Sequence, residues 1–116
     1  MSTDPDCLFC KIVAGDVPAE VVHTDERTVA FRDVNPQAPT HVLVVPRSHH
    51  RNAAELAAED PESLVAVVSA AGQVAVAEGL DTGYRLVFNT GAEAGQTVFH
   101  VHLHLLGGRQ LEWPPG

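Results

Sequence analysis

The stretch His100-Val101-His102-Leu103-His104-Leu105-Leu106 carries the most information in this sequence. Histidine and an apolar residue alternate along it, and a period of two is typical of a β-strand with one buried face. On such a strand the three imidazoles lie on one face, spaced about 6.5–7 Å apart, and the apolar side chains lie on the other. The sequence therefore predicts a strand over 98–106 that presents a row of histidines.

Three neighbouring imidazoles are hard to explain by structure alone, because each buried neutral ring needs a hydrogen-bond partner. Imidazole is nucleophilic at neutral pH and leaves phosphorus readily, which suits transfer of a phosphoryl or nucleotidyl group in two steps. Crowding disfavours protonation of all the rings together and helps to keep an attacking ring neutral. A metal site is the alternative, and the spacing does not separate it from catalysis.

The segments around this stretch predict an α+β fold. β-rich runs over 21–23, 28–32, 41–45 and 84–89 complete a five-stranded antiparallel sheet, because most neighbouring runs are joined by short connections. Asp60-Pro61 begins a long helix over 61–78 with an apolar stripe, and a short helix is expected over 7–14. The acidic stretch 55–62 is expected to be solvated surface.

Length and charge limit the possible functions. The chain of 116 residues has room for one domain, expected over 1–116 with a flexible tail at 1–6. Its net charge of −8 argues against a nucleic-acid polymer as partner. No run approaches the roughly 18 apolar residues of a membrane span. An acidic N-terminus and only two cysteines lead us to expect a cytoplasmic protein with no membrane partner.

The histidine stretch is followed by two apolar residues and accompanied by Pro36-Gln37-Ala38-Pro39-Thr40-His41, Gly95-Gln96-Thr97-Val98 and Gly107-Gly108-Arg109-Gln110. Together these motifs resemble the histidine triad family, and within it the Hint branch of purine nucleoside phosphoramidases. The resemblance implies a homodimer with one continuous sheet, in which residues 107–116 lie near the partner. It also implies hydrolysis of nucleoside 5′-phosphoramidates or related purine nucleotide conjugates through a nucleotidyl-histidine intermediate. No cofactor is expected in the chemistry.

The same resemblance assigns roles to individual residues. His102 is the expected nucleophile, His104 contacts the phosphate and helps to protonate the departing amine, and His41 orients the cluster together with His100. Asp33 is expected to accept the ribose hydroxyls. The other expected substrate contacts are Phe9, Phe31, Val34 and Leu43 at the base, Asn89, Gly95, Gln96 and Thr97 at the phosphate, and Trp113 in the C-terminal tail.

A separate pattern concerns metal. Cys7-x-x-Cys10 resembles superfamily members in which such a pair joins two histidines on zinc, here His49 and His100. Cys2His2 is a common closed structural zinc set. His50 is an alternative to His49, and two free thiols are the alternative to a metal. Zinc is expected to stiffen the base of the nucleophile's strand without taking part in the chemistry.

Three other functions remain open at this point. Dinucleoside polyphosphate hydrolysis, as in the Fhit branch, uses the same kind of histidine cluster, although the C-terminal Trp113-Pro114-Pro115-Gly116 favours Hint. A nucleotide-binding or scaffold protein could have incidental catalysis. A metal-handling protein could bind ions through the histidines themselves.

Overall fold

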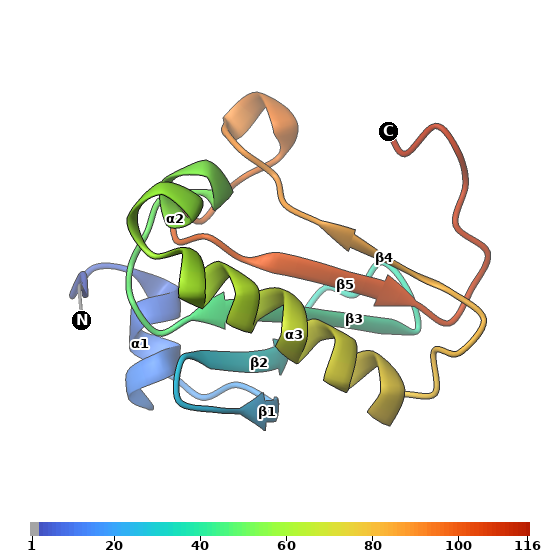
Figure 1. The fold of residues 1–116 in the computed structure, drawn as a ribbon, viewed down its shortest axis with the longest axis horizontal. Coiled ribbons are helices and arrows are strands. Elements are labelled where there is room, and N and C mark those ends of the chain that lie inside the picture. The colour runs from blue at the N-terminus through green and yellow to red at the C-terminus, as the bar shows by residue number, and fades with distance from the viewer. Residues whose placement is uncertain (1–2) are drawn as a thin grey trace.

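Five antiparallel strands form one sheet in the order β1-β2-β3-β5-β4 (Figure 1). The computed structural model describes residues 3–116. The strands are β1 (Val21–Thr24), β2 (Thr28–Arg32), β3 (Thr40–Pro46), β4 (Tyr84–Val87) and β5 (Leu103–Gly107). The predicted five-stranded antiparallel sheet of an α+β fold is confirmed.

The helices are α1 (Leu8–Ala14), α2 (Ala53–Glu59) and α3 (Pro61–Ala77), with a 3-10 turn, η1, at Ala92–Ala94. The long helix α3 begins as predicted, because the Asp60 side chain accepts from the backbone N–H of Ser63 and Pro61 takes the first position. The prediction of surface over 55–62 is wrong at α2. Leu56 is fully buried there, and Asn52 caps the helix by accepting from the backbone N–H of Glu55.

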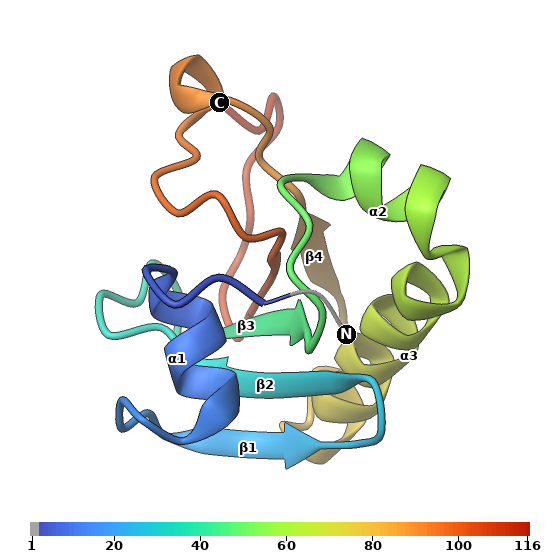
Figure 2. The same cartoon turned by 90° about the vertical axis from the view of Figure 1, so that its left-hand side faces the viewer.

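The two faces of the sheet have different cores. Figure 2 shows α1 and α3 on opposite sides of the strands. On β3, Val42 and Val44 belong to the cluster under α3, whereas Leu43 and Val45 belong to the cluster under α1. Leu105 on β5 also packs under α3. His104 lies between the apolar residues of β5 and pairs with Leu43, so it lies on the α1 face, as the period of two predicts.

The predicted strand over 98–106 is wrong at its start, because β5 begins at Leu103. Residues 98–102 are irregular, and the backbone N–H of Val101 donates to the carbonyl of His50 at 2.7 Å. Its neighbour β4 ends at Val87 and not at Asn89. Val101 and Leu103 are nevertheless buried, so the apolar side of the pattern still faces the core.

The two ends of the chain lie outside the two hydrophobic clusters. Residues 1 and 2 of the predicted tail lie outside the described residues, while residues 4–6 form a turn in which Asp4 accepts from the N–H of Cys7 at 3.1 Å. At the other end Trp113 is 81% exposed. Among the described residues, no helix has the length and apolar character that crossing a membrane requires.

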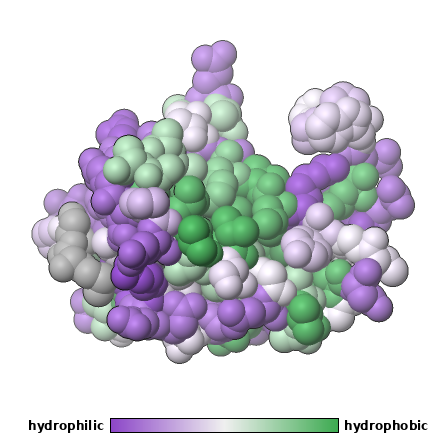
Figure 3. All heavy atoms as spheres, viewed as in Figure 1, coloured by the Kyte–Doolittle hydropathy of each residue, from purple (hydrophilic) through white to green (hydrophobic). Residues whose placement is uncertain are grey.

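Apolar side chains are also exposed on α3. Figure 3 shows apolar surface gathered across the middle of the face on which α3 lies. Val65, Val68 and Val76 of α3 are exposed, with Val76 at 83%. Helices of globular proteins usually turn such residues inward, so this face has room for a partner.

Candidate functional site

His102 is held in one tautomer by the backbone. Its Nδ1 lies 2.8 Å from the carbonyl oxygen of His100. A carbonyl oxygen only accepts, so Nδ1 carries the hydrogen and donates it, and Nε2 of the neutral ring keeps its lone pair. Burial lowers the pKa of His102, while the hydrogen bond to His100 and the charge of Asp33 oppose that shift. The result is a neutral imidazole with one fixed nucleophilic nitrogen.

The tautomer of His104 is set by two hydrogen bonds in series, from the backbone of Gln37 to His41 and from His41 to His104. The backbone N–H of Gln37 donates to Nδ1 of His41 at 3.0 Å, so the His41 proton lies on Nε2. His41 Nε2 in turn lies 2.9 Å from Nδ1 of His104 and donates to it. The proton of a neutral His104 ring is therefore on Nε2, a buried atom with no hydrogen-bond partner among the described residues. Burial, followed by the charges of His102 and His41, lowers the pKa of His104 to about 4.

His41 and His100 contact different members of the histidine row, and their joint role in orienting it stays a prediction. On β3 His41 pairs with Leu106, which places its ring beside His104 and 5.2 Å from it between centroids. His100 precedes β5, and its Nε2 donates to the carbonyl of Pro46 at 2.9 Å. The two histidines therefore serve different ends of the row.

Asp33 follows β2 and approaches the same histidines. Its Oδ2 lies 3.5 Å from Nε2 of His41, and its Oδ1 accepts from the backbone N–H of Asn35 at 2.8 Å. Its charge raises the pKa of His41, although burial has the larger effect and lowers that pKa. The carboxylate is thus fixed at the edge of the histidine row.

Most of the apolar residues expected at the base gather beside this row. Phe9 of α1 makes edge-to-face contacts with Phe31 and His102, with centroid distances of 5.5 and 5.0 Å. Leu43 belongs to the same buried cluster. Val34 does not, because its side chain is completely exposed. Trp113 is exposed as well, and its tail is tied down where Arg85 donates to the carbonyl of Glu112.

The predicted phosphate loop is only partly free. The Gln96 amide nitrogen donates to the carbonyls of Arg51 and Val98, and its oxygen accepts from the N–H of Gly91. The backbone N–H groups of Gly95 and Gln96 also donate within the loop. Thr97 is exposed, so its side chain is open to solvent. The Gln96 amide nitrogen is therefore engaged within the chain, and contact of Gln96 with a phosphate stays a prediction.

Asn89 lies beside the same loop. Its Nδ2 is 3.9 Å from the position that a Cβ on Gly95 would take. Gly95 has a φ of +94°, which an L side chain rarely adopts, so glycine allows the turn at this position. The structure thus brings Asn89 to Gly95, as the sequence analysis grouped them.

The predicted metal ligands meet at the base of α1. Cys7, Cys10, His49 and His100 each place one donor atom within 4.8 Å of the others. Nδ1 of His100 lies 3.5 Å from both sulfurs and 3.2 Å from Nδ1 of His49. A tetrahedral zinc with bonds of about 2.3 Å to sulfur and 2.0 Å to nitrogen separates S···N pairs by about 3.5 Å and N···N pairs by about 3.3 Å. The residues therefore fit zinc.

Hydrogen bonds within this cluster also suit a metal. Because His100 Nε2 donates to Pro46, its Nδ1 carries a lone pair toward the thiols. His50, the alternative ligand, is turned away. Its Nδ1 pairs with Glu59 and its Nε2 with the hydroxyl of Ser48, both at 3.0 Å. The geometry selects His49.

The family model described as "HIT domain" matches residues 14–111 of this sequence, which is most of the chain. The chain belongs to the HIT domain family. A HIT family hydrolase of Legionella pneumophila has a crystal structure with 52% identity and a TM-score of 0.91, covering 96% of this chain and 100% of that one. The fold and sequence are thus those of HIT family hydrolases.

Two curated relatives extend the family match. An uncharacterized HIT-like protein of Synechococcus elongatus is 49% identical over 111 residues, covering 96% of this chain and 97% of that protein. The 14 kDa zinc-binding protein of Zea mays is 46% identical over 115 residues, covering 97% and 90%. The chain therefore spans nearly the whole length of both relatives.

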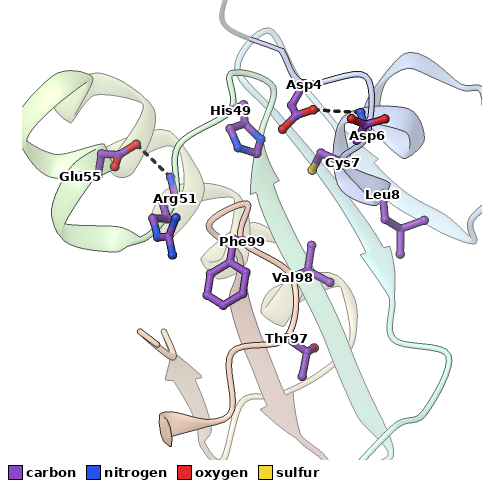
Figure 4. Close-up of a pocket in the computed structure, with 10 residues that line it drawn as sticks. All are labelled: Asp4, Asp6, Cys7, Leu8, His49, Arg51, Glu55, Thr97, Val98 and Phe99. Atoms are coloured by element: carbon purple, nitrogen blue, oxygen red, sulfur yellow. Dashed lines mark hydrogen bonds between the residues drawn. The ribbon is translucent and has the colours of Figure 1, made fainter. Parts of the chain in front are cut away.

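A cavity of about 610 Å³ lies on the metal side of this HIT domain (Figure 4). Cys7 and His49 line it, so the metal cluster forms part of its wall. Thr97 and Phe99 line the opposite wall, with the guanidinium of Arg51 over the Phe99 ring at 4.8 Å. The cavity thus connects the edge of the metal cluster with Thr97 of the predicted phosphate loop.

One contributor to the HIT histidine row was missed by sequence reasoning. Gln37 acts on His41 through its backbone N–H, so no side-chain pattern announces it. The only signal is the place of Gln37 between Pro36 and Pro39, in a segment with few backbone N–H donors. Backbone donors become visible only when the loop is folded.

Proposed function

We propose that this HIT protein hydrolyses nucleoside 5′-phosphoramidates or related purine nucleotide conjugates through a nucleotidyl-His102 intermediate. The observation that carries the proposal is the hydrogen bond from Nδ1 of His102 to the carbonyl of His100. It leaves the Nε2 lone pair as the nucleophile at neutral pH. His41 also has a fixed tautomer beside His104, but both of its ring nitrogens are engaged, Nδ1 by Gln37 and Nε2 by His104.

The first step forms a bond between His102 Nε2 and the α-phosphorus and breaks the phosphorus–nitrogen bond of the substrate. The departing amine takes a proton from Nε2 of His104, whose ring centroid lies 5.0 Å from that of His102. A substrate atom at this place gives the buried Nε2–H its missing partner. The pKa of about 4 belongs to the cation of His104, so the ring is neutral at rest. The negative charge of the bound phosphate favours uptake of one proton from solution by His104, and the ring becomes neutral again when its Nε2 gives a proton to the amine.

The second step releases the nucleotide. Water attacks phosphorus, the bond to His102 Nε2 breaks, and the water proton is released to solution. The products are a nucleoside monophosphate and the free enzyme. One proton is taken up in the first step and one is released in the second, so the histidine row ends neutral, as it began. General acid–base catalysis by one positioned group contributes typically about 10²–10⁴-fold to a rate.

The remaining predicted contacts are proposed to hold the nucleotide. Asp33 accepts from ribose hydroxyls, Thr97 donates its hydroxyl to the phosphate, and Asn89 lies near enough to assist. Phe9, Phe31 and Leu43 offer apolar surface to a purine beside His102, which favours the base by buried area. Val34 and Trp113 are exposed, and their contact with substrate stays a prediction.

A structural zinc at Cys7, Cys10, His49 and His100 is proposed as part of the folded protein. When bound, zinc would supply a fixed anchor for His100 and no step of the reaction. The residues themselves connect the two sites, because His100 places Nδ1 in the cluster and its carbonyl on His102. The zinc-binding name of the maize relative supports this assignment.

A homodimer is proposed on the apolar surface left open. β4 is an edge strand of the sheet, and its Tyr84 and Leu86 are exposed. Exposed edges and apolar patches are usually covered in stable proteins. A partner that extends the sheet at β4 would cover both, and sedimentation at micromolar concentration should then give twice the chain mass.

The test compares rates on an adenosine phosphoramidate and a diadenosine polyphosphate, with His102→Ala measured on both. We expect the phosphoramidate to be preferred and the variant to lose at least about 10³-fold, as removal of a nucleophile does. Preference for the polyphosphate would favour the other hydrolase function. Turnover of the variant within about tenfold of wild type would leave a binding protein with incidental catalysis.

A further inference from the structure

We propose that Arg109 is a positioning residue for the histidine row, because it clamps the backbone segment that fixes the tautomer of His41. The inference rests on the proposed function for its effect on the reaction, although the clamp itself is independent of it. Arg109 follows β5 and its side chain is exposed, so packing in the core does not hold it in place.

The guanidinium of Arg109 joins two loops. Its Nε and Nη2 both donate to the carbonyl oxygen of Gln37, at 3.2 and 3.0 Å, and its Nη1 donates to the carbonyl of Gln110 at 2.8 Å. A planar fork with several fixed donors holds an acceptor in place better than a single flexible amine does. The Gln37 carbonyl is thus held by two donors from a residue 72 positions away.

The backbone on the other side of Gln37 is the part that acts on His41. The N–H of Gln37 donates to His41 Nδ1 at 3.0 Å, so both backbone groups of this residue are engaged. The two loops are also closely packed, because a Cβ on Gly108 would lie 3.0 Å from Cβ of Pro39. Loss of the Arg109 contacts would free the segment that carries the donor.

The position of that donor decides where the protons of the row lie. While Gln37 donates to Nδ1, His41 can carry its proton only on Nε2, from which it donates to His104. His104 then keeps its own proton on Nε2, where the proposed leaving group needs it. Without the Gln37 donor, Nδ1 of His41 becomes free to take a proton.

Three titratable groups face this pair and would respond. Asp33, beyond β2, lies 3.5 Å from His41 Nε2 and favours the charged form of His41. His104 on β5 contacts His41 directly, and His102 lies next to His104. With the clamp open, Asp33 would favour a second proton on Nδ1 of His41. The positive charge of His41 would then disfavour protonation of His104, which the proposed acid step requires.

The experiment uses the full chain with its natural metal content and compares Arg109→Ala, Arg109→Lys and the control Arg47→Ala. Arg47 is a matched control because its Nε donates to the carbonyl of Asp25 at 3.0 Å, beyond the opposite end of β3. Long-range proton–nitrogen NMR correlations report the tautomer of His41 directly. Initial rates with an adenosine phosphoramidate give kcat and KM.

We expect Arg109→Ala to mix the tautomers or protonate His41 at neutral pH, and to lower kcat by about 10–100-fold with KM within about twofold. Arg109→Lys should recover part of both effects, and Arg47→Ala should change neither. An unchanged His41 tautomer in Arg109→Ala would overturn the clamp. A changed tautomer with unchanged kcat would overturn its role in the reaction. Wild-type protein without turnover would instead refute the proposed function, and the NMR comparison would still decide the clamp.

Discussion

His102 donates its Nδ1–H to the carbonyl oxygen of His100 at 2.8 Å, while the His100 ring reaches back into the Cys2His2 cluster. One residue therefore links the predicted metal site to the predicted nucleophile, through its side chain on one side and its backbone on the other. Displacing the His100 ring would move the carbonyl that fixes His102.

The choice of His49 over His50 as metal ligand gives the first prediction. His49→Asn should lose bound zinc, because His49 Nδ1 lies 3.5 Å from the Cys10 sulfur and 3.2 Å from His100 Nδ1. His50→Asn should keep about one zinc per chain, because His50 points at Ser48 and Glu59. Elemental analysis of protein purified without chelator measures both. Equal zinc loss in the two variants would show that the geometry selects the wrong histidine.

Removal of the metal should also destabilise the fold near His102. A strong chelator is expected to lower the melting temperature and to broaden the NMR signal of His102, since the ring of His100 then loses its anchor. Cys10→Ser should reproduce both effects without chelator. Ser63→Ala is a suitable control, because that buried hydroxyl bonds Asp60 at the start of α3 and is remote from the cluster. It should lower stability with no change in zinc content.

The stability of the protein should fall in mild acid because of His104. Its pKa is 6.5 when unfolded and about 4 when folded, so between these values the unfolded chain binds a proton that the folded chain does not. The contribution of His104 to the free energy of unfolding is therefore complete above pH 6.5 and is lost as the pH falls toward 4. The slope for this group is at most about 1.4 kcal/mol per pH unit. His104→Asn should show a shallower slope in urea unfolding at equal metal content.

Asp25 provides an internal check on that window. Burial raises the pKa of Asp25, but hydrogen bonds from Thr28 and His23 outweigh it and hold the pKa at about 2. The stability that this carboxylate contributes is present above pH 3.8 and is lost only as the pH falls from there toward 2. An identical pH profile for His104→Asn and wild type between pH 6.5 and 4 would show that His104 is not the responsible group.

The hydroxyl of Thr97 should matter for turnover, and its methyl group should not. Thr97→Ser keeps the donor and is expected to stay near the wild-type rate. Thr97→Val removes it and should lower kcat/KM about 10–100-fold, the equivalent of a hydrogen bond to a charged group worth about 1.5–3 kcal/mol. Steady-state rates on the phosphoramidate measure both. Equal rates in the two variants would remove Thr97 from the phosphate site.

Gln96 should act on stability, in contrast to Thr97. Its amide satisfies the carbonyls of Arg51 and Val98 and the N–H of Gly91. Gln96→Met has similar length but leaves these groups without partners, so the free energy of unfolding should fall by about 1–3 kcal/mol. Urea denaturation checks the value. A variant as stable as wild type but with weaker substrate binding would instead favour the direct phosphate contact.

The alternation of apolar and polar residues predicted which side chains share a face of the sheet, but it did not predict where the strands begin and end. The pleat has a fixed period of two, so alternation at Leu103 and Leu105 was enough to place the histidines on the opposite face. The start of β5 depends on a tertiary contact, because the N–H of Val101 pairs with His50 and not with a neighbouring strand. Helix α2 was missed because Leu56 is a single large apolar residue in an acidic stretch.

The composition of the site could be predicted, whereas its hydrogen bonding could not. Cys7-x-x-Cys10 and the histidine alternation are visible in sequence because side-chain chemistry defines them. His49 and His50 are equivalent in that respect, and only the turn after β3 separates their directions. The tautomer of His41 depends on the backbone of Gln37, and backbone donors leave no signature in composition.

Rapid chemical quench with an adenosine phosphoramidate, followed by mass spectrometry of peptides, tests the central claim most directly. We predict that one adenylyl group is trapped on His102 during turnover and is absent from His102→Ala. A modified residue other than His102, or rapid product formation without any adduct on the chain, would contradict the account.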